Sequence, residues 1–149
     1  MENEVTTGRA RRRVLFICVA NACRSQLAEA FSRHLAADVI DPSSAGFYPL
    51  GRISEATRTV GEEMGLSFDG QSSKGFGPAD LDRADLVVNL SGIPSAIVLE
   101  TEKTVIDWDV EDPYGEELDV QRRIAAEIEA RVVHLAAEFR SERARASTG

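Results

Sequence analysis

Residues 14–25 decide the fold of this chain, and they read Val14-Leu15-Phe16-Ile17-Cys18-Val19-Ala20-Asn21-Ala22-Cys23-Arg24-Ser25. Four apolar residues lead directly into Cys18, and a short unbroken apolar run of this kind predicts a strand buried in a parallel sheet. After the loop, apolar side chains recur at helical spacing from Ser25 to about Ala37, which predicts a helix. The first turn of that helix would present unbonded N–H groups to the loop. The stretch therefore predicts an anion-binding loop with a cysteine nucleophile at its base.

The alternation of strand and helix continues along the chain. We expect further strands at 39–46, 86–90 and 105–106, helices at 54–65 and from about 120 to 139, and one helical turn at 81–85. Residues 69–78 are expected to form a loop, and 97–99 fit either a helix or a strand. This order predicts an α/β fold with an open parallel sheet and helices on both faces. Ligands bind such sheets beyond the carboxyl ends of the strands, where Cys18 is expected to lie.

Length and composition set limits on the classes of function. A chain of 149 residues with 43% hydrophobic residues is expected to be one globular domain. A net charge of −8 argues against a general nucleic-acid binder. No apolar run approaches the roughly 20 residues that span a membrane, and no signal-peptide pattern is present, so a cytoplasmic location is expected.

The two ends of the chain are expected to lie outside the folded domain. A cluster of arginines just before the first strand (Arg9, Arg11, Arg12, Arg13) fits a solvated arm. We therefore predict a domain over residues 13–140, a flexible N-terminal arm over 1–12 and a flexible tail over 141–149.

The residue types in the loop fit attack on a tetrahedral oxyanion. A helix N-terminus and an adjacent cation both favour the thiolate form of a cysteine, and Cys18 is expected to have both. Arg24 can bind two oxygens of the anion with its planar guanidinium, and the hydroxyl of Ser25 can donate to the thiolate. The alternative is a buried structural cysteine at a strand end, with Arg24 in a surface ion pair.

The backbone of the loop is expected to bind the anion through its N–H groups. Small side chains at Ala20 and Ala22 allow the chain to curl, and Asn21 tolerates a left-handed conformation. The candidate substrate-binding residues of the loop are Val19, Ala20, Asn21, Ala22, Cys23 and Ser25.

Asp112 is the leading candidate for the proton donor that such a reaction needs. It follows a predicted strand parallel to the first one, which places it at the same edge of the sheet. The alternative is that Asp112 is one solvated carboxylate in an acidic segment. Tyr114 either lines the mouth of the site or packs against the last helix.

The second cysteine and the histidines carry weaker signals. Cys23 could form a reversible disulfide with Cys18 that protects the nucleophile, or it could be a packed thiol. His34 and His134 fall on predicted helices, distant from any cluster with metal-ligand spacing. No metal site is expected.

Three short motifs together resemble those of a known family. In order and spacing, Cys18–Ser25, Ser44-Ala45-Gly46 and Asp112-Pro113-Tyr114 are similar to the motifs of the low-molecular-weight protein tyrosine phosphatase superfamily, which also contains related arsenate reductases. The resemblance implies a four-stranded parallel sheet in a flavodoxin-like three-layer sandwich. It also implies Cys18 as nucleophile, Arg24 as phosphate-binding residue and Asp112 as general acid, with no metal or organic cofactor.

The residues at a few sequence positions distinguish the phosphatases of this superfamily from its arsenate reductases. Gln26-Leu27-Ala28-Glu29 resembles the arsenate reductases, whereas phosphatases more often have proline at position 26. The thioredoxin-coupled reductases need further cysteines after the 86–90 strand, but this chain has none there, and Ser91 stands about where the first would be. A serine cannot perform thiol exchange.

The sequence therefore predicts a phosphatase that hydrolyses phosphotyrosine-type phosphomonoesters through a cysteinyl-phosphate. The alternative is an arsenate reductase that relies on an external thiol or redoxin, and a third hypothesis is a non-catalytic anion-binding module. The expected partners are a phosphorylated protein or a small phosphate or arsenate oxyanion, with a thiol or redoxin in the second case.

Overall fold

The sheet predicted from the strand pattern is present and is parallel throughout. The computed structural model describes residues 11–148. Its strands are β1 (Arg12–Cys18), β2 (Ile40–Gly46), β3 (Leu86–Asn89) and β4 (Val105–Asp107). They form one four-stranded sheet in the order β2-β1-β3-β4, with every pair parallel. The expected four-stranded parallel sheet is thereby confirmed.

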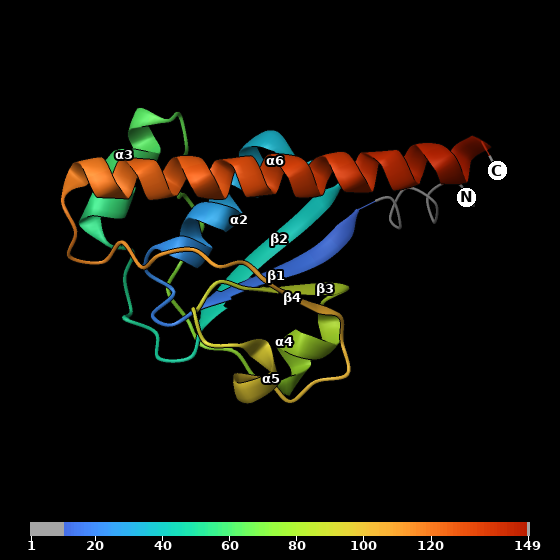
Figure 1. The fold of residues 1–149 in the computed structure, drawn as a ribbon, viewed down its shortest axis with the longest axis horizontal. Coiled ribbons are helices and arrows are strands. Elements are labelled where there is room, and N and C mark those ends of the chain that lie inside the picture. The colour runs from blue at the N-terminus through green and yellow to red at the C-terminus, as the bar shows by residue number, and fades with distance from the viewer. Residues whose placement is uncertain (1–10, 149) are drawn as a thin grey trace.

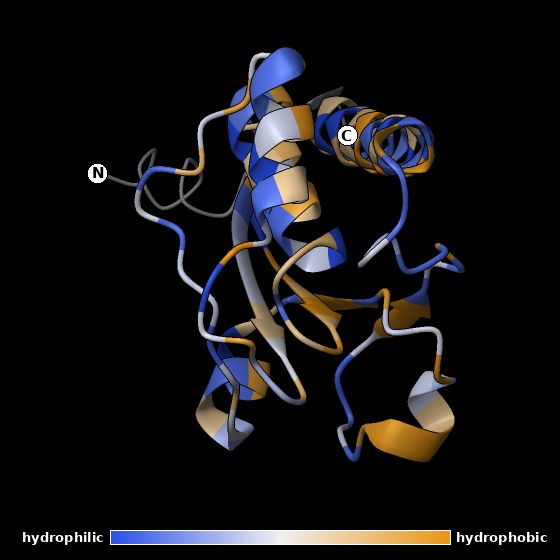
Figure 2. Ribbon diagram, turned by 90° about the vertical axis from the view of Figure 1, so that its left-hand side faces the viewer, coloured by the Kyte–Doolittle hydropathy of each residue, from blue (hydrophilic) through white to orange (hydrophobic). Residues whose placement is uncertain are grey.

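Helices cover both faces of this sheet (Figures 1 and 2). One face carries α2 (Arg24–Leu35), α3 (Glu55–Glu63) and α6 (Leu118–Thr148), and the other side carries the short helices α4 (Pro78–Arg83) and α5 (Ser95–Val98). The ambiguous residues 97–99 thus begin inside a short helix. None of the helices within residues 11–148 combines the length and apolarity that crossing a membrane requires.

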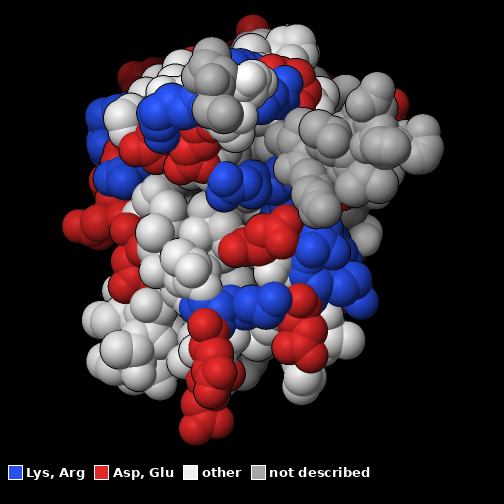
Figure 3. Space-filling view, turned by 90° about the vertical axis from the view of Figure 1, so that its right-hand side faces the viewer, with Lys and Arg blue, Asp and Glu red and all other residues white. Residues whose placement is uncertain are grey.

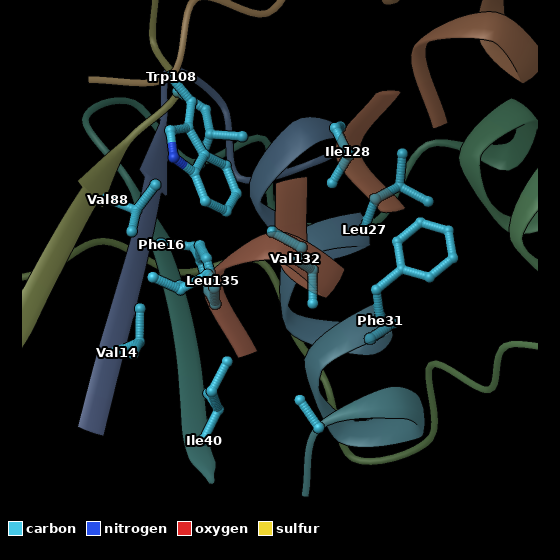
Figure 4. Close-up of a cluster of buried hydrophobic side chains, with 14 of the residues drawn as sticks. Val14, Phe16, Leu27, Phe31, Ile40, Val88, Trp108, Ile128, Val132 and Leu135 are labelled. Atoms are coloured by element: carbon cyan, nitrogen blue, oxygen red, sulfur yellow. The ribbon is translucent and has the colours of Figure 1, made fainter. Parts of the chain in front are cut away.

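From Val14 to Cys18, strand β1 is apolar on both faces because it lies between two cores. Phe16 points into the larger core, and Ile17 belongs to the smaller core on the opposite face. Successive side chains of a strand point to opposite faces, so a strand covered on both sides has no polar positions. Figure 4 shows side chains of the larger core converging between the sheet and helices α2 and α6: Val14, Phe16, Val88, Leu27, Phe31, Ile128, Val132 and Leu135.

Trp108 extends this core to the end of β4. Its ring lies 5.8 Å from that of Phe16 between centroids, and its backbone N–H donates to the carbonyl of Asn89 at 2.9 Å. The first residue of the loop after β4 is therefore anchored to the core.

Helix α6 continues further than the sequence predicted. It ends at Thr148, so residues 141–148 continue the helix, whereas a separate tail was expected from 141. Near this end of the helix, Arg140 and Arg143 donate to Asp38 in the α2–β2 connection. Periodicity in the sequence does not register these contacts, because they join residues about a hundred positions apart.

The basic cluster before β1 is matched by acidic side chains. Arg11 lies 3.7 Å from Asp41, and the guanidinium of Arg13 donates to Asp85 at 3.0 Å. Arg12 is the first residue of β1 and donates to Glu142 of α6. Figure 3 shows this end of the molecule, where basic and acidic side chains lie next to one another. Arg9 and the rest of the predicted arm up to residue 10 lie outside the described residues.

Candidate active site

Cys18 lies at the carboxyl end of β1, where the sequence placed the nucleophile. The residue is 2% exposed, and its Sγ lies 2.9 Å from the hydroxyl oxygen of Ser25 in the first turn of α2. The side-chain amide of Asn21 donates to the same hydroxyl oxygen at 2.7 Å. Since Asn21 supplies a hydrogen to that oxygen, the hydrogen of Ser25 is free to point at the sulfur. The Ser25 hydroxyl can therefore donate a hydrogen bond to the Cys18 sulfur.

A buried chain of hydrogen bonds continues from Asn21 to a carboxylate. The Asn21 amide also donates to the hydroxyl of Ser44 at 3.0 Å, and that hydroxyl donates to Glu29 at 2.6 Å. Glu29 is 2% exposed and pairs with Arg33 at 2.5 Å. Ser44 is the first residue of the Ser44-Ala45-Gly46 motif, so two of the three motifs meet at Asn21.

The loop itself has its carbonyl groups turned outward. Asn21 adopts a φ of 47°, the only positive φ at a non-glycine among residues 11–148. Each carbonyl of the loop has a donor on the outer side: Cys18 O accepts from Phe47 N, Val19 O from Tyr48 N, Ala20 O from Leu50 N, Asn21 O from the Gln26 side chain and Ala22 O from Ser54 N. The N–H groups of residues 19–23 make no hydrogen bond within the described part of the chain. They remain available to an anion, as does the N-terminus of α2.

Gly46 permits the close approach that this arrangement needs. A Cβ at this position would lie 2.7 Å from both the nitrogen of Asn21 and the carbonyl oxygen of Val19. The glycine in the Ser44-Ala45-Gly46 motif is therefore explained by contact between the end of β2 and the loop.

Arg24 is buried beside the loop and faces the segment after β4. The residue is 4% exposed, its Nη1 donates to the carbonyl of Val110 at 3.2 Å, and its Nη2 lies 3.7 Å from the carboxylate of Asp112. Its Nε is buried without a hydrogen-bond partner among residues 11–148. A buried guanidinium with a spare donor is suited to bind an oxyanion.

Asp112 reaches the site from the loop between β4 and α6. Its side chain is 58% exposed, and one carboxylate oxygen accepts from the N–H of Tyr114 at 3.0 Å. The amide of Gln121 donates to Pro113 O at 2.7 Å and to Glu116 O at 3.2 Å, which ties this loop to α6. Tyr114 is 55% exposed, so it does not fill the core beneath α6.

Cys23 lies immediately before α2 as a buried free thiol. The residue is 5% exposed, and no disulfide joins it to Cys18 in this structure. Burial raises the pKa of the Cys23 thiol, an effect that the nearby hydroxyls of Thr57 and Ser54 partly oppose. Both sequence hypotheses for Cys23 remain predictions.

The loop after β3 lies beside Arg24. Ser91 is 6% exposed, and its hydroxyl accepts from the N–H of Ile93 at 3.1 Å. A Cβ built on Gly92 would lie 3.9 Å from Nη1 of Arg24. The segment where the thioredoxin-coupled reductases would have a further cysteine is thus close to Arg24. In this chain it carries the hydroxyl of Ser91.

The sequence analysis missed several residues that hold the loop from outside. Gln26 is fully buried and bridges the loop to residue 72, while the amide of Gln71 donates to Gln26 Oε1 at 2.8 Å. The N–H of Lys74 donates to Oδ1 of Asn21 at 2.9 Å. Gln71 and Lys74 fall in the stretch 69–78, which the sequence predicted as a loop, and Gln26 falls in the predicted helix after Ser25. A buried polar side chain in the first turn of α2 was the one available signal.

The histidines take no part in the site. His134 on α6 lies 3.3 Å from Glu138. Within residues 11–148, no group of three or more His, Cys, Asp and Glu side chains is arranged to hold a metal ion.

Comparison with known proteins places this geometry in a family. The family model described as low molecular weight phosphotyrosine protein phosphatase matches residues 13–145. A relative named glutaredoxin arsenate reductase from Synechocystis sp. is 33% identical over 86% of this chain and 98% of its own length. A solved arsenate reductase in the phosphate binding state is 32% identical, with a TM-score of 0.72 over 86% of this chain and 98% of the other.

A phosphatase is also among the solved structures that resemble this one. The arginine phosphatase from Geobacillus stearothermophilus is 25% identical, with a TM-score of 0.81 over 90% of this chain and 96% of the other. The match to the family model covers most of the chain, and the chain therefore belongs to the low-molecular-weight phosphotyrosine protein phosphatase family.

Proposed function

We propose that this protein reduces arsenate, with Cys18 as nucleophile and an external thiol as reductant. The observation that carries the proposal is the thiol of Cys18, 2.9 Å from Ser25, at the base of a loop whose N–H groups have no partner in the described chain. The relatives favour arsenate over the phosphomonoester predicted from the sequence, because a full-length relative at 33% identity is named an arsenate reductase. The alternative of the sequence analysis thus becomes the leading function.

The first step forms a covalent bond between sulfur and arsenic. Arsenate would bind to the loop N–H groups and to Arg24, which match its negative oxygens. The Cys18 thiolate attacks arsenic, and one oxygen leaves as water after Asp112 supplies a proton. The product is a thioester-like adduct in which arsenic is still pentavalent.

The second step reduces arsenic and requires thiols from outside the chain. A first thiol attacks the sulfur of Cys18, and the electron pair of the S–As bond stays on arsenic, which leaves as trivalent arsenite. A second thiol then attacks the mixed disulfide and restores Cys18. In total, arsenate and two thiols give arsenite, one disulfide and water. The chain has only two cysteines, and Cys23 is buried with a raised pKa, so the two thiols are assigned to a small thiol or a redoxin.

The proposal is tested by following arsenite formation from arsenate with glutathione alone, with glutathione and glutaredoxin, and with thioredoxin. We expect turnover that depends on the thiol in at least one of these mixtures and that disappears in Cys18→Ser. Turnover that persists in Cys18→Ser, or none with any reductant, would contradict the proposal.

Phosphate-ester hydrolysis is the second candidate, and it is favoured by the same cysteine count. Water can release phosphate from a cysteinyl-phosphate without any further thiol, with Asp112 first as acid and then as base. An aryl phosphate and a phosphoarginine peptide are suitable substrates, because the solved relative with a TM-score of 0.81 is an arginine phosphatase. Hydrolysis without arsenate reduction would select this candidate, and binding of phosphate without either reaction would select an anion-binding module.

A further inference from the structure

Among the outward-facing carbonyls of the loop, that of Asn21 differs in its donor. Four others, on Cys18, Val19, Ala20 and Ala22, accept from backbone N–H groups of residues 47–54. A backbone donor is present whatever the side chain, proline excepted. The carbonyl of Asn21 instead accepts from the side chain of Gln26 at 3.0 Å. This one carbonyl depends on the identity of a particular residue.

Gln26 uses its whole amide group for this contact and its surroundings. One Nε2 hydrogen goes to Asn21 O and the other to Ser72 O, each at 3.0 Å. Its Oε1 accepts from Nε2 of Gln71 at 2.8 Å, and Gln71 also donates to the backbone carbonyl of Gln26 at 3.2 Å. The residue is 0% exposed. A buried amide whose two N–H donors and oxygen are all hydrogen-bonded is held in one orientation.

The carbonyl that Gln26 holds belongs to the residue with the least stable backbone in the loop. Asn21 has a φ of 47°, which is uncommon for residues other than glycine and persists where the surroundings hold it. If the carbonyl lost its donor, rotation of the peptide between Asn21 and Ala22 would turn the oxygen inward and the N–H of Ala22 outward. The cradle would then lose a donor and gain a negative dipole facing the anion.

We infer that Gln26 is a positioning residue for oxyanion binding. It holds the carbonyl of Asn21 away from the anion-binding N–H groups of the loop, and Gln71 fixes the orientation of the Gln26 amide. Gln26 does not touch the oxyanion and acts only through the loop. This inference rests on the proposed function to the extent that the loop binds phosphate or arsenate, and it holds for either of the two candidate reactions.

The test is phosphate binding by the full chain in calorimetry, with inorganic phosphate as probe. Gln26→Met keeps the length of the side chain and removes both donors, and we expect phosphate binding to weaken about 10- to 100-fold, the range for a buried acceptor left without a donor.

A matched control separates positioning from general stability. Arg140→Met removes hydrogen bonds to Asp38 and to the carbonyl of Leu35, at the opposite end of α2 from Gln26. It should lower the melting temperature and leave phosphate affinity within about twofold of the wild type. Equal phosphate affinity in Gln26→Met and the wild type would overturn the inference, as would an equal loss in Gln26→Met and Arg140→Met.

Gln71→Met tests the same contact if Gln26→Met does not fold. It leaves the bond from Gln26 to Asn21 in place but removes the donor that orients the amide, so we expect phosphate affinity to fall about 3- to 10-fold. An unchanged affinity would overturn the inference. If the wild type itself binds neither phosphate nor arsenate, the proposed function fails instead, and the two failures are distinguishable.

Discussion

The guanidinium of Arg24 lies 3.7 Å from the carboxylate of Asp112, although one residue opens helix α2 and the other lies in the loop before α6. Arg24 is 4% exposed, whereas the side chain of Asp112 is 58% exposed. The cation is thus fixed by the protein, while the carboxylate stands at the opening of the site with access to solvent. An exposed carboxylate such as that of Asp112 can exchange protons with solvent, whereas the buried guanidinium of Arg24 keeps its charge.

Asp112→Asn tests the role of that carboxylate. We expect arsenite formation from arsenate to slow about 10²- to 10⁴-fold, because the oxygen that leaves arsenic loses its proton donor. The measurement is the steady-state rate against pH, with phosphate binding as the control, which should be retained. A rate within a few-fold of the wild type would assign the proton to another group or to water.

Gly46→Ala tests the contact between β2 and the loop. The new Cβ would lie 2.7 Å from the Asn21 nitrogen, so the loop must shift, at a cost of about 1–3 kcal/mol in stability and with loss of phosphate affinity. Thermal unfolding and phosphate calorimetry measure the two effects. Gly77→Ala is the control, since a Cβ at that position meets no atom within 4 Å. Normal phosphate binding by Gly46→Ala would show that the loop tolerates displacement.

The two cysteines should differ in reactivity. Burial raises the pKa of the Cys23 thiol, whereas Cys18 lies 2.9 Å from the Ser25 hydroxyl at the base of a loop with unbonded N–H groups. Iodoacetamide at neutral pH is expected to label Cys18 first, and Cys23 only at higher pH or after unfolding. Peptide mass spectrometry measures this, with Cys18→Ser as the control. Labelling of Cys23 at the rate of Cys18 would contradict the expectation and favour a redox role for both.

The contact between α6 and the α2–β2 connection should give an acid-dependent stability. Hydrogen bonds from Arg140 lower the pKa of Asp38 to about 2, despite an opposing desolvation effect. A lowered carboxyl pKa stabilises the fold above the ordinary value, and this stability is lost as the pH falls toward about 2. Both side chains are about half-exposed (45% and 51%), so the contribution should stay below about 1 kcal/mol.

Arg140→Met measures that contribution. The difference in melting temperature between the wild type and this variant should be larger at about pH 6 than at about pH 3, because at the lower pH Asp38 takes up a proton in the unfolded chain, whereas the folded wild type, with its lowered pKa, still holds the carboxylate ionised. Asp38→Asn, which cannot titrate at this position, should show the same loss of pH dependence. A constant difference across this range would show that the helix contact does not depend on the charge of Asp38.

The local parts of this protein could be predicted from its sequence. The apolar run before Cys18 predicted a buried strand, and helical spacing after Ser25 predicted α2, because both depend on residues that are close in the chain. The types and order of Cys18, Asn21, Arg24 and Ser25 predicted an anion-binding loop before any contact was known. The order of strands and helices was enough to predict a parallel sheet, since short right-handed connections leave few alternatives.

Only the tertiary structure decided which distant residues complete the site. Asp112 meets Arg24, Gly46 lies against Asn21, and Gln26 joins the loop to residues 71 and 72. None of these pairs has a periodic signal, because the contacts arise from the packing of separate elements against one sheet. The extension of α6 to Thr148 depends in the same way on contacts with Asp38 and Arg12. Residue types and spacing thus determined the chemistry of the loop, and packing determined which neighbours hold it in shape.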